Sequence, residues 1–339
     1  MAKKDARPRS RKRAPARRSR GPRVLLIGAL LLVAAFGGGW FLWAGPGPAT
    51  QELSVVVPEG ATLSRAAREL EKAGAIPSRQ IFLTFAKFFG GDGTIRAGEY
   101  RIAPRTSARQ LLVMLQEGKT LQRLVTVPEG TPSVGVAEAL AKAPALTGTV
   151  QTPEEGSVLP DSYAYGRDEP RAAVLARMQK AMRVYLAKAW AGRDKGLVVT
   201  TPREAIILAS IVEKETGKPS ERTTVAAVYA NRLKTGMPLQ ADPTIIYPIT
   251  KGKPLGRRIL QSELRAKNGY NTYTMRGLPA GPIANPGRAA IDAVLHPAQS
   301  KALYFVADGT GGHVFAETYQ QHQANVAKWY AIRRAKGEM

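Results

Sequence analysis

The residue with the clearest potential for chemistry is Glu215, a carboxylate near the end of an apolar run. The spacing of Leu208, Ile211 and Val212 predicts one apolar face of a helix. Glu215 is the next member of that face, whereas Glu213 points to a different side. Burial on such a face raises the pKa of a carboxyl, so that it can act as a general acid near neutral pH. The alternative is that Glu215 is the hydrated end of an ordinary amphipathic helix.

The helix that would carry Glu215 has sequence signals at both ends. Thr201 can cap the first turn, and Pro202 fits the first helical position. Glu204, three residues after Thr201, completes a capping box. Gly217 and the proline two residues later end the pattern. We therefore expect a helix from about residue 202 to residue 216.

The stretch 240–287 is rich in loops and combines amides, hydroxyls and aromatic rings. Such side chains bond to sugar hydroxyls and pack on pyranose faces, so carboxylate chemistry on a glycosidic bond fits this combination. Other site types have no support in the sequence. It contains no cysteine, no phosphate-binding Walker loop and no G-x-S-x-G motif. The three histidines lack a metal-ligand spacing, which indicates structural or surface roles for His296, His313 and His322.

The charge of the chain is strongly positive and unevenly distributed. The formal net charge is +24, and residues 1–23 alone hold 11 Lys and Arg against one Asp. We expect this basic tail to be disordered and cytoplasmic. A basic body can bind nucleic acid, anionic lipid or an acidic polymer, but no nucleic-acid recognition motif is present. Nucleic acid is therefore not an expected partner.

Residues 24–44 form an uncharged run of 21 residues that ends with two tryptophans, Trp40 and Trp43. As a helix this run is roughly 31 Å long, which matches a bilayer core of about 30 Å. The alternative is a cleaved signal peptide, but the run is long for one and no clear cleavage site follows it. We expect an uncleaved membrane anchor with the remainder of the chain outside the cytoplasm.

Beyond a short linker at 45–52, the pattern predicts a small βα module at 53–120 and a mixed α+β domain at 121–339. The tetrapeptide Val-Pro-Glu-Gly occurs at 57–60 and again at 127–130, each time between a β-rich run and a helical pattern. This repeat indicates either two related βα units or two ordinary turns. In the larger domain we expect helices at 170–190 and 221–234, a hairpin at 303–316, and a last helix capped by Thr318.

Several ordered motifs resemble the endolytic murein transglycosylase (YceG-like) family. They are Ala-Ser-Ile-Val-Glu-Lys-Glu-Thr at 209–216, Asn-Arg-Leu at 231–233, Leu-Gln-Ala-Asp-Pro-Thr at 239–244, Tyr-Asn-Thr-Tyr at 270–273, Gly-Leu-Pro at 277–279 and Tyr-Phe-Val-Ala-Asp-Gly at 304–309. The order of tail, anchor, small module and larger domain is also similar to that family. The resemblance implies that the module is LysM-like and that 121–339 is the catalytic domain.

The resemblance further implies a single-pass inner-membrane protein whose catalytic domain faces the periplasm. Such an enzyme cuts nascent peptidoglycan strands at the β-1,4 bond between N-acetylmuramic acid and N-acetylglucosamine and leaves 1,6-anhydromuramic ends. Glu215 would be the catalytic residue, as acid and then as base, with no metal or cofactor. Peptidoglycan synthases are candidate partners. The candidate substrate-binding residues are Gln240, Asp242, Asn271, Tyr273 and Glu213.

Two alternatives remain open at this stage. A hydrolytic muramidase would need a second carboxylate, for which Glu213 or Asp242 is available. A non-catalytic glycan-binding scaffold would need no catalytic carboxylate. Asp242 precedes a proline and is equally plausible as a turn residue. The sequence also departs from the family at Asn285, where a threonine is common, and this leaves the details of the subsites open.

Overall fold

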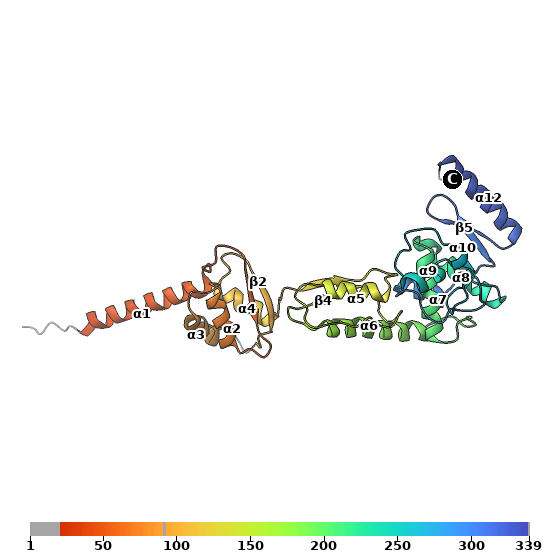
Figure 1. Ribbon diagram of the computed structural model, residues 1–339. Coiled ribbons are helices and arrows are strands. Elements are labelled where there is room, and N and C mark those ends of the chain that lie inside the picture. Colours follow the sequence, from red (N-terminus) through yellow and green to blue (C-terminus); the bar gives the residue numbers. More distant parts are fainter. Residues whose placement is uncertain (1–20, 91–92, 338–339) are drawn as a thin grey trace, which may run out of the picture. The chain divides into compact units, whose positions relative to one another are not determined.

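The computed structural model describes residues 21–90 and 93–337, and side chains from residue 26 onward. It divides into two compact units, the first ending at Leu121 and the second beginning at Gln122, which we describe separately (Figure 1). Most of the basic tail, for which we predicted disorder, lies outside the described residues. The predicted boundary at 120/121 falls one residue from the division between the units.

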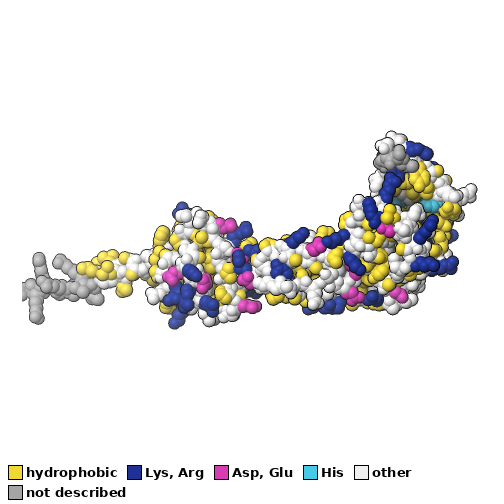
Figure 2. Space-filling view, in the orientation of Figure 1, with side chains coloured by type: hydrophobic (Ala, Val, Ile, Leu, Met, Phe, Trp, Pro, Cys, Tyr) yellow, Lys and Arg dark blue, Asp and Glu magenta, His cyan; other side chains and the backbone are white. Residues whose placement is uncertain are grey.

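The first unit begins with helix α1 (Gly21–Ala44), which includes the predicted span 24–44. Among the described residues it is the one helix long and apolar enough to cross a membrane. Its apolar side chains are widely exposed, as the run of hydrophobic residues along α1 in Figure 2 shows, with Leu31 65% and Val33 70% exposed. This exposure is compatible with a membrane anchor, whereas the orientation of α1 stays a prediction.

The remainder of the first unit is a small α+β module. Its elements are β1 (Leu53–Val57), α2 (Leu63–Lys72), α3 (Arg79–Phe89), β2 (Gly98–Ile102) and α4 (Ala108–Glu117). The two strands pair antiparallel, with Leu53 opposite Ile102. Alternate residues of β1 face the helices, so that Val55 and Val57 are buried while Val56 is exposed. The module is thus mixed α+β, and its likeness to LysM stays a prediction.

Trp43, at the end of α1, belongs to the core of this module. Its side chain is 1% exposed and its ring lies 5.7 Å from that of Phe82 and 6.0 Å from that of Phe85. The last turn of α1 and the module therefore share one apolar core. The predicted linker at 45–52 follows Trp43, so the packing of α1 against the module begins before the linker.

We expect Trp43→Ala to destabilise the first unit by about 3–5 kcal/mol, because it removes a large buried ring. Trp40→Ala is the matched control, since Trp40 is 41% exposed and should cost much less. Limited proteolysis and thermal melting of the full chain in detergent measure the difference. Equal losses for the two variants would show that Trp43 is not a core residue.

The second unit begins with a pair of antiparallel strands and two helices. These are β3 (Arg123–Thr126), α5 (Ser133–Lys142), β4 (Ser162–Tyr165) and α6 (Arg171–Ala191). Val174 and Met178 of α6 pack in a cluster with the strands and α5, whereas Met182 joins the core around α7. The long helix α6 thereby connects the two parts of the unit.

The two Val-Pro-Glu-Gly segments adopt the same turn. In each, the proline carbonyl accepts a bond from the amide three residues on, at 3.1 Å for Pro58 and 3.2 Å for Pro128. Gly60 and Gly130 have φ angles of +68° and +72°, a conformation that favours glycine. Each turn leads from a strand into a helix, so the segments are equivalent βα connections.

The remaining elements of the second unit surround helix α7. They are α7 (Pro202–Glu215), η1 (Pro219–Glu221), α8 (Arg222–Lys234), α9 (Pro243–Thr250), α10 (Gln261–Leu264), α11 (Arg288–Leu295), β5 (Tyr304–Ala307), β6 (His313–Ala316) and α12 (Tyr319–Ala335). Helix α7 packs against α6, α8, α9 and α11; Figure 1 shows α7 beside α8 and α9. The loop-rich stretch 240–287 contains two short helices, and the predicted hairpin and capped last helix are confirmed.

Candidate active site

Helix α7 holds Glu215 in its last turn, and its first turn is fixed by the predicted capping box. The Thr201 hydroxyl accepts a bond from the Glu204 amide at 3.1 Å, and the Glu204 carboxylate accepts one from the Thr201 amide at 3.3 Å. Every residue from Ala205 to Val212 is buried. The middle of the helix is therefore enclosed by the rest of the unit and supports the carboxyl at its end.

A pocket of about 280 Å³ opens beside Glu215. Its walls come from α7, α8, the loops before α9 and α11, strand β5 and helix α12. The lining residues are Glu215, Tyr229, Arg232, Gln240, Asp242, Tyr273, Phe305 and His322. Among the described residues, no group of three or more His, Asp or Glu side chains is arranged to hold a metal ion.

The environment of Glu215 keeps its carboxyl protonated to higher pH. Burial raises the pKa of Glu215 to about 7, and the negative charge of Asp242 acts in the same direction. A hydrogen bond from the Tyr229 hydroxyl and the positive charge of Arg232 oppose this shift in pKa. Oε1 of Glu215 is closed to solvent and has no hydrogen-bond partner in the described structure. Glu215 is thus placed to carry and donate a proton.

Asp242 and Tyr273 form a pair on another wall of the pocket. The Tyr273 hydroxyl donates to Oδ1 of Asp242 at 2.6 Å. Burial, this bond and the charge of Asp242 raise the pKa of Tyr273, so its hydroxyl stays protonated. Asp242 also stands directly before α9, but its side chain makes no capping bond there. Both interpretations of Asp242 therefore hold in part, since it precedes a helix and faces the pocket.

Arg232 supplies a fixed positive charge to the pocket. Its Nε donates to the Leu303 carbonyl at 2.7 Å and its Nη1 to the Leu239 carbonyl at 2.6 Å. Neutral carbonyls hold the guanidinium in place without cancelling its charge. Arg232 lies in the Asn-Arg-Leu motif, but its spacing from Glu215 did not mark it as part of a site.

His322 lines the pocket, although the sequence indicated a structural or surface role for it. Its ring stacks on Tyr304 at a centroid distance of 5.1 Å and an interplanar angle of 20°. Burial, and then the charge of Arg232, lower the pKa of His322, which favours the neutral imidazole. Its Nδ1 has no hydrogen-bond partner in the described structure. No signal in the sequence indicates that His322 lies in the pocket, because only the fold brings α12 to the pocket beside Glu215.

Gln240 lies in the pocket as predicted, but Asn271 lies behind it. Asn271 is fully buried, and its side-chain amide donates to the carbonyls of Glu263, Leu264 and Ala266 at 2.8 to 3.2 Å. Its Oδ1 accepts a bond from the Tyr273 amide at 3.0 Å. Asn271 therefore shapes the loop that presents Tyr273.

Glu213 also lies outside the residues that line the pocket. Its Oε2 accepts a bond from the Gly287 amide at 2.9 Å, and its Oε1 is 3.9 Å from Nη2 of Arg222. Burial raises the pKa of Glu213 and Glu129 adds to the shift, while the Gly287 amide opposes it. A side-chain carbon at position 287 would overlap the Glu129 carboxylate. Glu213 thus ties the end of α7 to the start of α11.

Asn285 joins three segments of the second unit. Its Oδ1 accepts a bond from the Val158 amide at 3.0 Å, and its Nδ2 donates to the Thr131 carbonyl at 2.9 Å. It is fully buried and is not among the residues that line the pocket. The departure from the family at this position therefore affects a structural junction.

Comparison with known proteins shows to which family the chain belongs. A model of the YceG-like family matches residues 55–328. The chain belongs to this family. The resemblance drawn from its motifs is thus confirmed.

Two curated relatives carry the name endolytic murein transglycosylase. The one from Bacillus subtilis (strain 168) is 27% identical over 317 residues, covering 84% of this chain and 86% of the relative. The one from Streptococcus pneumoniae (strain ATCC BAA-255 / R6) is 29% identical over 326 residues, covering 81% of this chain but 58% of the relative. The crystal structure of a YceG-like protein from Listeria monocytogenes matches 81% of this chain and 99% of its own, with a TM-score of 0.50 and 26% identity.

The raised pKa of Glu215 predicts a pH-dependent gain in stability for Glu215→Gln. Below about pH 4 the carboxyl is protonated in the folded and unfolded chain, so the substitution changes little. Between the ordinary pKa and about 7 only the unfolded chain ionises, and the wild type therefore loses stability as pH rises. Above pH 7 the variant should be more stable than the wild type by up to about 3 kcal/mol.

Denaturant unfolding of both proteins from pH 4 to pH 8 measures this difference. Glu204→Gln is the contrasting control, because backbone and hydroxyl donors lower the pKa of Glu204. That variant should lose stability relative to the wild type at high pH. A Glu215→Gln difference independent of pH would contradict the burial of a protonated carboxyl.

Proposed function

We propose that this chain is a membrane-anchored lytic transglycosylase that cuts peptidoglycan strands internally, with Glu215 as its single acid and base. The observation that carries the proposal is a carboxyl with a pKa of about 7 in a pocket that also holds Asp242 and Tyr273. The names of the relatives, which match more than four-fifths of this chain, support the same activity.

The first step breaks the β-1,4 bond between C1 of N-acetylmuramic acid and O4 of N-acetylglucosamine. Protonated Glu215 donates its proton to O4 as the C1–O4 bond breaks, which prevents the release of an alkoxide. Glu215 is then a carboxylate. The Tyr229 hydroxyl and the charge of Arg232 stabilise it in that state, as their effect on its pKa indicates.

The second step closes the muramic ring. The breaking of the C1–O4 bond leaves positive charge at C1, which the side chain of Asp242 in the same pocket stabilises until the ring closes. The 6-hydroxyl of the same sugar attacks C1, so that a C1–O6 bond forms and the hydroxyl proton passes to Glu215. No water is consumed, the product is a 1,6-anhydromuramic end, and Glu215 regains its starting proton.

A hydrolytic muramidase is the second candidate, because Asp242 places another carboxylate in the pocket. In that reaction water replaces the 6-hydroxyl, and the product is heavier by one water. A non-catalytic glycan-binding scaffold would release no product at all. Mass analysis of digested glycan strands therefore distinguishes the three functions.

Glu215→Gln should abolish strand cleavage, since the amide keeps the shape of the side chain but has no proton to donate. We expect a loss of about 10²–10⁴-fold or more. The measurement is the release of anhydromuropeptides from purified glycan strands, with thermal melting to confirm that the variant is folded. Products heavier by one water from the wild type would support the muramidase instead.

Glu213→Gln is the matched control on the same helix. The new side-chain amide keeps an oxygen that can accept the bond from the Gly287 amide, so activity should only weaken. A variant at 213 that is folded but inactive, beside an active variant at 215, would reassign the acid. If both variants stay active, a mechanism with one carboxylate is wrong.

We also propose that α1 spans the inner membrane once and that residues 45–339 lie outside the cytoplasm. Support comes from the apolar helix and from the 11 Lys and Arg residues that precede its uncharged run 24–44, because such residues favour the cytoplasmic side. A reporter enzyme that is active only in the cytoplasm should be inactive when fused to the C-terminus. Strong reporter activity would reverse the topology.

A further inference from the structure

Helix α3 of the first unit has an apolar stripe whose last residues lie outside the core of the module. Ile81, Phe85, Phe88 and Phe89 have helical spacing and form this stripe. Phe88 is 74% exposed and Phe89 is 52% exposed, whereas Phe82 and Ala86 are buried in the core and Phe85 packs against it. Two adjacent phenylalanines with this exposure form an unusual surface for contact with water.

The stripe continues directly into the aromatic end of α1. The ring of Phe89 lies 5.3 Å from that of Trp40, and the ring of Phe85 lies 6.2 Å from that of Phe36. Gly39 permits this approach, because a side-chain carbon there would lie 2.8 Å from the Phe85 ring. The contacts cover the last part of α1, where it meets α3 in Figure 1.

The length of α1 determines where these contacts lie in a bilayer. A span needs about 20 residues to cross a core of about 30 Å, so the whole uncharged run 24–44 is required. If the span ended at Phe36, it would contain 13 residues and reach only roughly 20 Å. Phe36 lies eight residues before Ala44, roughly 12 Å along the axis. With α1 spanning the membrane as proposed, the rings of α3 that touch Phe36 and Trp40 lie at the depth of the outer leaflet.

We propose that the stripe on α3 is a membrane-docking surface that inserts into the outer leaflet beside α1. This inference rests on the proposed anchoring by α1. The occupant is the lipid bilayer itself, since Phe and Trp are suited to the boundary between headgroups and acyl chains. The module is thereby held on the membrane surface by two helices.

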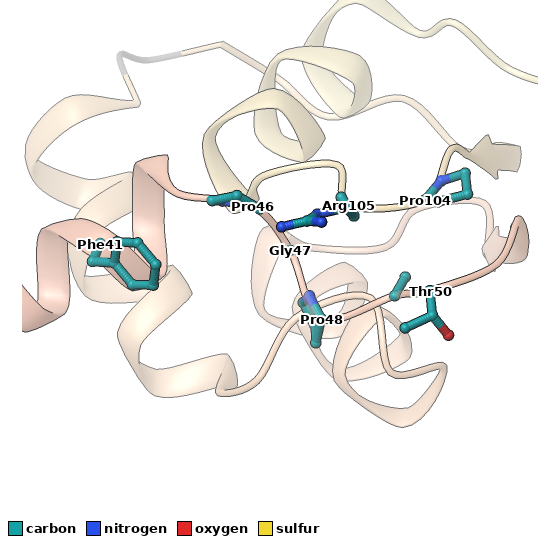
Figure 3. A pocket seen from close by; sticks show the side chains of 8 residues that line it. Phe41, Pro46, Gly47, Pro48, Thr50, Pro104 and Arg105 are labelled. Carbon is teal, nitrogen blue, oxygen red and sulfur yellow. The ribbon is translucent and has the colours of Figure 1, made fainter.

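The charge of α3 itself fits the same occupant. The helix contains Arg79 and Lys87 but no acidic residue, and Lys87 is exposed beside the stripe. Its long side chain can extend toward lipid phosphates while its neighbours stay in the apolar layer. Arg105 adds an exposed cation near the end of α1, in the pocket that it lines with Phe41 and Pro46 (Figure 3). These cations lie where headgroups are expected.

Nitroxide labels at single cysteines can test the proposal in the full chain, which contains no native cysteine. The protein is reconstituted in vesicles of phosphatidylethanolamine and phosphatidylglycerol, and the access of oxygen and of a water-soluble nickel chelate to each label is measured. A label at Phe88→Cys should show an oxygen-to-nickel access ratio several-fold above that of Val56→Cys. Val56 is the matched control, being an exposed apolar residue of the same module on strand β1, 41% exposed.

A label at Leu31→Cys separates failure of this proposal from failure of the anchor. If the label at Leu31 is in lipid and the label at Phe88 is in water, the docking surface is wrong and the anchor stands. If the label at Leu31 is in water, the anchor and the docking surface both fail. A Phe88 label shielded from both reagents would indicate a protein partner and overturn the proposal. A lipid signal from Val56 as well would also overturn it, because docking would not be specific to α3.

Discussion

The acid–base properties of the pocket in the second unit depend on the desolvation of one carboxyl, that of Glu215. Glu215 stands at the end of a helix that is enclosed along eight consecutive residues, and burial is the largest cause of its raised pKa. A carboxyl in that position destabilises the folded chain when it ionises, so the fold must provide the remaining stability from the packing around α7. Tyr229 and Arg232 reduce the penalty without removing it, which leaves the pKa close to neutrality.

Two further carboxylates show how the same helix is held. Glu204 is bonded to three donors at the start of α7, and Glu213 accepts the Gly287 amide near its end. Glu213 and Glu215 are both desolvated, yet they differ in partners. Glu213 faces a backbone donor and Arg222, whereas Oε1 of Glu215 has no partner among the described residues. The two carboxyls near the end of α7 are therefore desolvated in different ways, Glu213 with a bonded oxygen and Glu215 with a buried oxygen that lacks a partner in the described part of the chain.

The sequence could predict what depends on local spacing. The capping boxes at Thr201 and Thr318 are confirmed, as are the hairpin and the helix that ends near Glu215. The presence of Gln240, Asp242 and Tyr273 in one pocket was also anticipated, through the resemblance. Each of these features rests on a motif of a few residues or on one helical face.

The rest could not be predicted because it depends on contacts between distant segments. Nothing near His322 in the sequence indicates that α12 reaches the pocket. Asn271 was a candidate substrate-binding residue, but its side-chain amide donates to three backbone carbonyls. Glu213 was expected on a different side of α7 from Glu215, which is correct, but that side is also covered because the start of α11 packs there. Helical periodicity gives the direction of a side chain and not what lies opposite it.

The end of the anchor illustrates the same limit for domain boundaries. Composition changes sharply after Ala44, where Gly and Pro follow the apolar run. This change predicted a linker between the anchor and the module. The packing boundary differs, because Trp43 is buried among Phe82 and Phe85 of α3. A soluble form beginning at residue 45 would lack this ring and would expose the apolar wall that it covers. The last turn of α1 and the module therefore form one packed unit, although the composition divides them.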